Sequence, residues 1–353
     1  MAWLVGLILV WLSCGPLTAA PPPPLQRWFY CPQNLAVDAN IDKIDTLFRR
    51  AAAAGYTHVL LTDSKFSRLG EMDPHYFRNL ERVKSLAAEL KLQIVPALFA
   101  IGYSNDLLWH DPNLIEALPV RDALFIVQGG QARLQPDPPL ALKGGDFADL
   151  SQWGWKDPAV SADEGAALIR DPKGQNARIV QKLKLTPFRQ YHLSVRIKTA
   201  LFRGTPEVKV IAGDRLLNYN SLGVKPTQDW QTHHVVFNSL DHTEANLYCG
   251  AWGAESGSLW FDDAKLEEVG LVNLVRRDGA PLRVRREAGS PLAEGSDFEK
   301  LSDPRMGNKP WNGSYDIWHE PPVIRTSLPD GTRLRVSYYH AVTVYDDQAM
   351  ICP

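Results

Sequence analysis

The sequence predicts a multidomain protein of mixed α/β and all-β class, in which a partial (β/α) barrel carries an inserted β-sandwich of the jelly-roll type. Residues 27–139 alternate between short apolar strands and amphipathic helices. Residues 140–268 contain recurring short strands without a long helical pattern, and residues 269–353 return to hairpins. A chain of 353 residues is long enough for two or three domains with a large core.

Residues 27–139 are predicted to form the first part of the barrel. Strand patterns cover Trp28–Cys31, Thr57–Thr62 and Leu92–Leu98, and helical periodicity covers Asp42–Ala54 and Pro74–Leu90. This alternation indicates a parallel sheet covered by helices, and it fits a barrel or an open sheet. No glycine-rich phosphate loop follows the first strand, which disfavours a nucleotide-binding fold. We also expect a hairpin over 124–134 and a domain boundary at the Pro-Asp-Pro-Pro segment 136–139.

Residues 140–268 are predicted to form the sandwich. Tyr191–Lys198 alternates apolar and polar side chains, as expected for a strand with one buried face. Six or more antiparallel strands over such a segment favour a sandwich or jelly roll. The predicted strands are Ala177–Leu185, Gln190–Thr199, Pro206–Ala212, Gln231–Asn238, Ala245–Trp252 and Ser258–Glu267.

Residues 269–353 are predicted to hold hairpins and a continuation of the barrel that is incomplete. Asp278-Gly279 indicates a turn between strands in Leu274–Val284, and Asp330-Gly331 indicates one in Val323–Val344. Only three to four barrel strands can be counted, whereas a closed barrel needs eight. We therefore expect a truncated form that lacks its catalytic half.

Residues 1–20 resemble a secretory signal peptide. An apolar run of about ten residues from Trp3 to Leu12 is too short to span a bilayer and precedes the small residues Ala19 and Ala20. Lipid anchoring at Cys14 is an alternative. Residues 21–26 are expected to form a proline-rich linker. The sequence therefore predicts a secreted, periplasmic or cell-surface protein without an integral membrane span.

The charge and cysteine content give no indication of several classes of partner and cofactor. A net charge of −2 gives no reason to expect nucleic acid as a ligand. Cys31, Cys249 and Cys352 are far apart, so neither a disulfide framework nor a zinc site can be predicted from their spacing.

Several short motifs lie in order along residues 144–268. Gly145-Asp146-Phe147 opens the segment, Asp229-Trp230-Gln231 precedes a strand, and the run Ser258–Asp263 (SLWFDD) leads into Leu266–Glu268. In these motifs the segment resembles carbohydrate-binding modules of the CenC type, and the flanking segments resemble the barrel of glycoside hydrolases. The resemblance implies a polysaccharide or oligosaccharide ligand. It also implies one structural Ca²⁺ held by Asp146 and Asp262, unless Asp262 is only a solvated strand end.

Aromatic side chains near the predicted loops are candidates for carbohydrate binding. Sugar rings present apolar C–H faces that pack on flat aromatic rings, and the chain holds 11 Trp residues. The alternative for each ring is a place in the sandwich core, which we expect for Trp230 and Trp260. The candidates for sugar contact are Trp153, Trp155, Tyr219 and Trp252.

Catalytic candidates are few. Glycoside hydrolysis normally needs two facing carboxyl groups, and no such pair stands out. Asp63 follows the second strand but also suits an Asx turn, Glu320 precedes two prolines in a loop, and His340 also suits a hydrogen-bonded core position. The sequence therefore predicts a secreted glycoside-hydrolase-like protein with a polysaccharide-binding module. The alternatives are a non-catalytic polysaccharide-binding protein and a cell-surface interaction protein, so enzymatic activity is left open.

Overall fold

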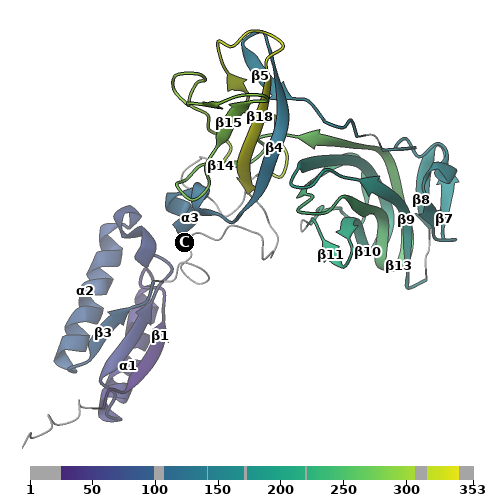
Figure 1. Ribbon diagram of the computed structural model, residues 1–353. Coiled ribbons are helices and arrows are strands. Elements are labelled where there is room, and N and C mark those ends of the chain that lie inside the picture. The colour runs from purple at the N-terminus through teal and green to yellow at the C-terminus, as the bar shows by residue number, and fades with distance from the viewer. Residues whose placement is uncertain are drawn as a thin grey trace, which may run out of the picture. The chain divides into compact units, whose positions relative to one another are not determined.

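A computed structural model describes residues 25–98, 107–140, 142–170, 173–218, 221–306 and 316–341 (Figure 1). The chain divides into two compact units, residues 1–106 and 107–353. The predicted signal peptide with Cys14, most of the proline-rich linker, and Tyr219 lie outside the described residues. No described helix is both long and apolar enough to span a membrane.

The first unit is a small α/β structure. Its three parallel strands pair in the order β1 (Trp28–Pro32), β2 (His58–Thr62) and β3 (Gln93–Pro96). Helices α1 (Asp38–Ala53) and α2 (Pro74–Glu89) connect them, and Asp73 caps the N-terminus of α2 because its carboxylate accepts the backbone N–H of His75 and Tyr76. This confirms the predicted parallel sheet, but three strands in this order fit an open sheet as well, so the barrel stays a prediction.

Two long bent strands organise the sandwich. Strands β10 (Gln190–Ala212) and β13 (Glu244–Val269) pair along their whole length, and their register shifts between Ala200 and Thr205. The first half of β10 pairs with β12, and its second half pairs with β11. Correspondingly, the two halves of β13 pair with β9 and β8. The remaining strands are β6 (Trp155–Lys156), β7 (Val160–Asp163), β8 (Ala166–Arg170), β9 (Gln175–Lys184), β11 (Arg215–Leu216) and β12 (Gln228–Asn238).

The bend divides the strands into two layers that enclose one core. One layer runs β12–β10–β13–β8–β7 and the other β11–β10–β13–β9–β6. A strand that bends at a bulge can pass from one layer to the next. Every second residue of each strand points inward, and burying one aliphatic side chain contributes about 1.5 to 3 kcal/mol. The inward set includes Leu193, Val195, Ile197, Val208, Val210, Ile179, Leu247 and Phe261.

A second antiparallel sheet is built from segments on both sides of the sandwich. Its order is β16–β15–β18–β4–β5–β17, with β14 beside β18, and a short helix α3 (Leu107–His110) precedes it. The hairpin predicted over 124–134 is confirmed as β4 and β5. The strands are β4 (Ala117–Gln128), β5 (Gln131–Leu134), β14 (Leu274–Val275), β15 (Arg283–Arg286), β16 (Pro291–Leu292), β17 (Ile324–Arg325) and β18 (Arg333–Ala341).

The prediction of a barrel continuation in residues 269–353 is wrong for the described strands. Strand β18 pairs antiparallel with β4, so that Tyr339 lies opposite Pro119 and His340 opposite Leu118. The hairpin predicted over Val323–Val344 is wrong as well, because β17 pairs with β5. Strand periodicity indicates a strand but does not specify its partner, and these partners are distant in the sequence.

Polar contacts join the sandwich to this second sheet. Asn238 at the end of β12 donates from Nδ2 to the carbonyl of Pro119 (2.9 Å) and to Nε2 of His340 (3.0 Å). Arg189, just before β10, donates from Nη2 to the carbonyl of Asp122 in β4 (3.0 Å), and within the sandwich it forms a buried ion pair with Glu268 (3.1 Å). Burial raises the pKa of Glu268 to about 7, and the positive charge of Arg189 opposes part of that rise.

Candidate binding face on the sandwich

The outer side of the layer that contains β6, β9, β13 and β10 carries a row of side chains across four strands. In register, Trp155 lies opposite Val180, Val180 opposite Tyr248, and Tyr248 opposite Lys209. Neighbouring strands lie about 4.8 Å apart, so the row extends over roughly 14 Å. The row therefore begins at an aromatic ring and ends at a cation.

Trp252 adds a second indole to the same face. It lies in β13 opposite Thr205, on the side of the strand that also carries Tyr248. The Nζ atom of Lys209 lies 4.1 Å from the centroid of the Trp252 ring, within the range of a cation–π contact. Asn176 at the start of β9 accepts the backbone N–H of Gly253 (3.0 Å), which holds the end of this strand segment beside β9.

Trp155 is the most exposed ring of this face, because half of its surface is accessible to solvent. The guanidinium of Arg178 lies 5.8 Å from its ring centroid. Arg178 is itself held by Asp157, whose carboxylate accepts the backbone N–H (2.8 Å) and Nε (3.3 Å) of the arginine. The cation beside Trp155 is therefore fixed in place before any ligand binds.

Strand alternation explains why these side chains point outward. Their neighbours Ile179, Leu247, Cys249 and Ala251 are fully buried in the sandwich core. Because successive residues of a strand point to opposite faces, Arg178, Val180, Tyr248 and Trp252 must lie on the outer side. Arg178 and Lys209 were not among the residues predicted for this site, although the same strand alternation could have placed them here.

A cavity of about 470 Å³ adjoins this face. It is lined by the outward residues Thr205, Glu207 and Lys209 of β10, and by the segment that follows β11. Glu207 and Lys209 form an ion pair of 2.5 Å. The buried Asn218 also lines the cavity, and its side chain accepts the backbone N–H of Val210 (2.7 Å) and donates to the carbonyl of Val208 (2.9 Å).

The other candidate aromatic residues occupy different places. Trp153 is 3% exposed, stacks on Phe147 with a centroid distance of 4.8 Å, and donates from Nε1 to the carbonyl of Gly144 (2.9 Å). The sugar-contact assignment of Trp153 is therefore corrected to a core position, because its ring is not accessible. Tyr219 lies outside the described residues.

The prediction that Trp230 and Trp260 lie in the sandwich core is wrong. Both are half-buried on the outer side of the other layer rather than in the core. The guanidinium of Arg196 lies 5.1 Å from the Trp230 ring, and Nζ of Lys198 lies 5.2 Å from the Trp260 ring. The indole of Trp260 also donates to Asp163 (2.7 Å).

The proposed calcium ligands Asp146 and Asp262 lie close enough for their charges to interact. Burial raises the pKa of Asp262, and the negative charges of Asp263 and Asp146 raise it further. A cation between the two carboxylates would relieve this repulsion, so the pair fits part of a calcium ligand set. Arg196 already supplies one positive charge, 3.8 Å from Asp262 and 3.0 Å from Asp263. Within the described residues, no group of three His, Cys, Asp or Glu side chains is arranged to hold a metal.

Asp63 is a fully buried carboxylate of the first unit. It accepts hydrogen bonds from the backbone N–H of Leu35 (2.7 Å) and from the Tyr76 hydroxyl (3.2 Å). Its other oxygen accepts the backbone N–H (3.1 Å) and Nζ (3.2 Å) of Lys65, which is the Asx turn that the sequence offered as an alternative. Asp63 thus ties together the ends of β1 and β2 and helix α2.

Glu320 and His340 have contrasting environments in the second unit. The side chain of Glu320 is 84% exposed and lies 3.9 Å from Arg133. His340 is buried, with Nε2 bonded to Asn238 and Nδ1 3.1 Å from the carbonyl of Ala341. Burial lowers the pKa of His340 to about 4, so the imidazole is neutral near pH 7. The structure places His340 in the core position that was its alternative interpretation.

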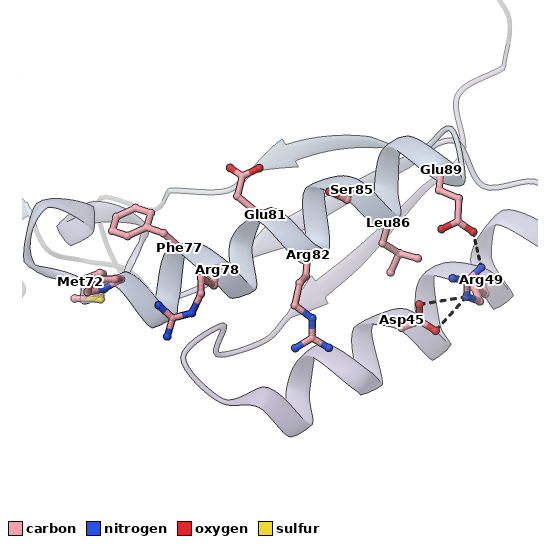
Figure 2. A pocket seen from close by; sticks show the side chains of 11 residues that line it. Asp45, Arg49, Met72, Phe77, Arg78, Glu81, Arg82, Ser85, Leu86 and Glu89 are labelled. Atoms are coloured by element: carbon pink, nitrogen blue, oxygen red, sulfur yellow. Dashed lines mark hydrogen bonds and ion pairs between the residues drawn. The ribbon is translucent and has the colours of Figure 1, made fainter.

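A shallow hollow of about 890 Å³ lies on the first unit between α1 and α2 (Figure 2). Arg49 bridges Asp45 (3.1 Å) and Glu89 (2.8 Å) across it. Three arginines and three carboxylates line the hollow, so their charges balance. It therefore presents no net charge to a ligand.

Comparisons with known proteins add only distant structural likenesses. No family model matches the chain, and no curated protein sequence matches it. One similar structure is a CBM4 carbohydrate-binding module, with 21% identity, 36% of this chain and 84% of that chain covered, and a TM-score of 0.27. Another is a CBM61 module in complex with β-1,4-galactotriose, with 17% identity, 36% and 97% covered, and a TM-score of 0.25.

A third similar structure is an arabinose-bound GH51 α-L-arabinofuranosidase. Its identity is 14%, 44% of this chain and 26% of that chain are covered, and the TM-score is 0.25. TM-scores this far below 0.5 do not establish a shared fold. The two-layered sandwich is defined instead by the pairing of this chain's own strands.

Proposed function

We propose that the sandwich binds a polysaccharide chain across the face formed by Trp155, Tyr248 and Trp252. The observation that carries the proposal is the placement of these three rings on one outer face, with Arg178 and Lys209 beside the two indoles. Aromatic planes suit the apolar C–H face of a sugar ring, and the charged groups suit its hydroxyls.

The shape of the face suits an extended ligand. A row of roughly 14 Å across the strands, continued by the cavity next to Lys209, offers contacts to several successive sugar rings. Half of the Trp155 surface is accessible to solvent, so its ring is free to contact a sugar without any rearrangement of the strand.

The proposal also includes two further properties, secretion of the protein and glycoside hydrolysis. They rest on the apolar N-terminal run and on the resemblance of the flanking segments to glycosidases. A non-catalytic binding protein is the second candidate. It is favoured by Asp63, whose two oxygens are already engaged by four donors, and by the buried, neutral His340.

Retention of the purified chain on insoluble polysaccharides tests the binding proposal. We expect the wild-type chain to be retained on at least one of cellulose, xylan, mannan and galactan. Trp155→Ala and Trp252→Ala should each lose that retention. Trp230→Ala is the matched control, because it removes a half-buried indole beside an arginine from the opposite layer and should leave retention unchanged.

Two outcomes would argue against the proposal. Equal retention of wild type and both variants would remove the aromatic face from the site. Retention of none of the polysaccharides would favour the cell-surface interaction protein instead. Release of reducing sugar by the wild-type chain would separate the hydrolase from the non-catalytic binder.

A further inference from the structure

The second sheet has one buried face and one face that carries arginines. Strand alternation buries Val284, Val336 and Tyr338 in the core beneath the sheet. The residues between them, Arg283 and Arg285 of β15, and Arg335, Ser337 and Tyr339 of β18, therefore point to the other side. Register places Arg283 opposite Ser337 and Arg285 opposite Arg335, so these side chains form one continuous surface.

This surface lines a groove of about 590 Å³. That volume lies in the range of ordinary ligand sites, which is about 300 to 1,000 Å³. Pro119 and Arg121 of β4 complete one wall, and Pro291 lies on the opposite wall. The groove thus combines cations, a tyrosine ring and proline rings.

The groove carries a local excess of positive charge on a chain whose net charge is −2. Four arginines line it, against the single carboxylate of Asp122. Arg285 pairs with Asp122 (3.1 Å), and Arg335 pairs with Glu287 and with Asp137 (3.3 Å). Two cations remain for a ligand.

These two cations are Arg121 and Arg283. Arg121 lies over the ring of Phe188, 3.6 Å from its centroid, which fixes the position of its guanidinium. Arg283 is exposed, and no carboxylate among the described residues pairs with it. The hollow between α1 and α2 differs, because its three arginines are balanced by three carboxylates.

We propose that this groove binds a carboxylate-bearing segment of a glycan, such as a run of uronic acid residues, through Arg121 and Arg283. A guanidinium binds a carboxylate through two parallel N–H donors, which gives both affinity and orientation. Tyr339 offers a ring to the sugar face. The inference that the ligand is a glycan rests on the proposed function. The inference that the ligand is negatively charged rests on the groove alone.

The test is calorimetric titration of the full chain with tetragalacturonate, with its methyl ester as the uncharged probe. We expect tetragalacturonate to bind and the ester to bind at least tenfold more weakly. Arg283→Ala should weaken tetragalacturonate binding about tenfold. Arg286→Ala is the matched control, because it removes an arginine of the same strand from the opposite face and should leave the affinity unchanged. Higher salt should weaken binding of the charged probe only.

Several outcomes would overturn the groove proposal. One is that the wild-type chain does not bind tetragalacturonate. Another is that Arg283→Ala and Arg286→Ala lose the same affinity for it. A third is that inorganic phosphate binds as tightly as the oligosaccharide. Trp155→Ala separates this site from the sandwich face. If Trp155→Ala abolishes tetragalacturonate binding while Arg283→Ala does not, the sandwich face binds the acidic glycan and the groove does not. If Trp155→Ala loses only retention on neutral polysaccharide, both sites stand.

Discussion

In the first unit, the strand-end carboxylate of Asp63 is fully buried and accepts hydrogen bonds from Leu35, Lys65 and Tyr76. In the sandwich, half of the surface of the Trp155 ring faces solvent, beside a cation that Asp157 already holds in place. The comparison teaches that a fully buried carboxylate with both oxygens hydrogen-bonded has no surface left for a ligand, whereas a half-exposed ring does. By this criterion the sandwich face, rather than Asp63, is the better candidate for ligand contact.

Among substitutions that test this comparison, the largest loss of stability is expected at Trp153, which lies two residues before Trp155. Trp153→Ala should lower the free energy of unfolding of the sandwich by about 4 kcal/mol, because it removes a fully packed indole and leaves a cavity. Trp155→Ala should change it by less than about 1 kcal/mol. Urea denaturation followed by circular dichroism measures both, and similar losses would contradict the placement of the two rings.

A slightly smaller effect is expected at Asp63. Asp63→Ala should destabilise the first unit by about 3 kcal/mol, because buried donors of Leu35, Tyr76 and Lys65 lose their acceptor. Asp63→Asn keeps the shape of the side chain and should lose less. Thermal unfolding of the full chain is the measurement. Unchanged stability together with lost enzymatic activity would contradict a structural role and restore the catalytic one.

The contribution of His340 to the free energy of unfolding depends on pH. Its pKa is about 4 in the folded chain because of burial, against about 6.5 when unfolded, so the unfolded state binds more protons between these values. The stabilisation is therefore present above about pH 6.5 and is lost as pH falls toward 4, by about 3 kcal/mol in all. Glu268, with a folded pKa of about 7, acts in the opposite direction over part of this window. The test is therefore the difference in unfolding free energy between wild type and His340→Gln, measured from pH 4 to 7.5. A difference that does not vary with pH would contradict the buried neutral imidazole.

The smallest effect is that of calcium. If Asp146 and Asp262 hold Ca²⁺, a free concentration tenfold above the dissociation constant should stabilise the sandwich by about 1.4 kcal/mol. Thermal unfolding in calcium and in chelator measures it. Asp262→Asn should remove the difference, and its persistence in this variant would place the ion elsewhere.

The sequence could predict local elements better than their partners. The parallel strands and both helices of the first unit are confirmed, because their periodicity is local. The sandwich strands were predicted at nearly the observed positions, but Gln190–Thr199 and Pro206–Ala212 are two halves of the single strand β10. Gly204, with φ of 151°, lies inside this strand where the register with β13 shifts. The partner of β18 could not be predicted, because the whole sandwich segment separates β4 from β18 in the sequence.

The candidate site was predicted in part for the same reason. Trp155 and Trp252 lie on an outer face, which sugar contact requires, whereas Trp153 does not. Trp153 precedes the two-residue strand β6 and Trp155 begins it, and so short a segment has no sequence periodicity that could tell the two rings apart. Arg178 and Lys209 lie in regular strands, where alternation with the buried Ile179 and Val208 could have assigned them to the outer face.

The most direct test of the account is the affinity of the sandwich face for an oligosaccharide of whichever polysaccharide retains the chain. Calorimetric titration should show at least a tenfold loss of affinity in Trp155→Ala, equivalent to about 1.4 kcal/mol. Trp155→Phe should recover part of it, because a flat ring remains, and circular dichroism should show both variants fully folded. Undiminished affinity in a folded Trp155→Ala would contradict the claim that this aromatic face binds the glycan.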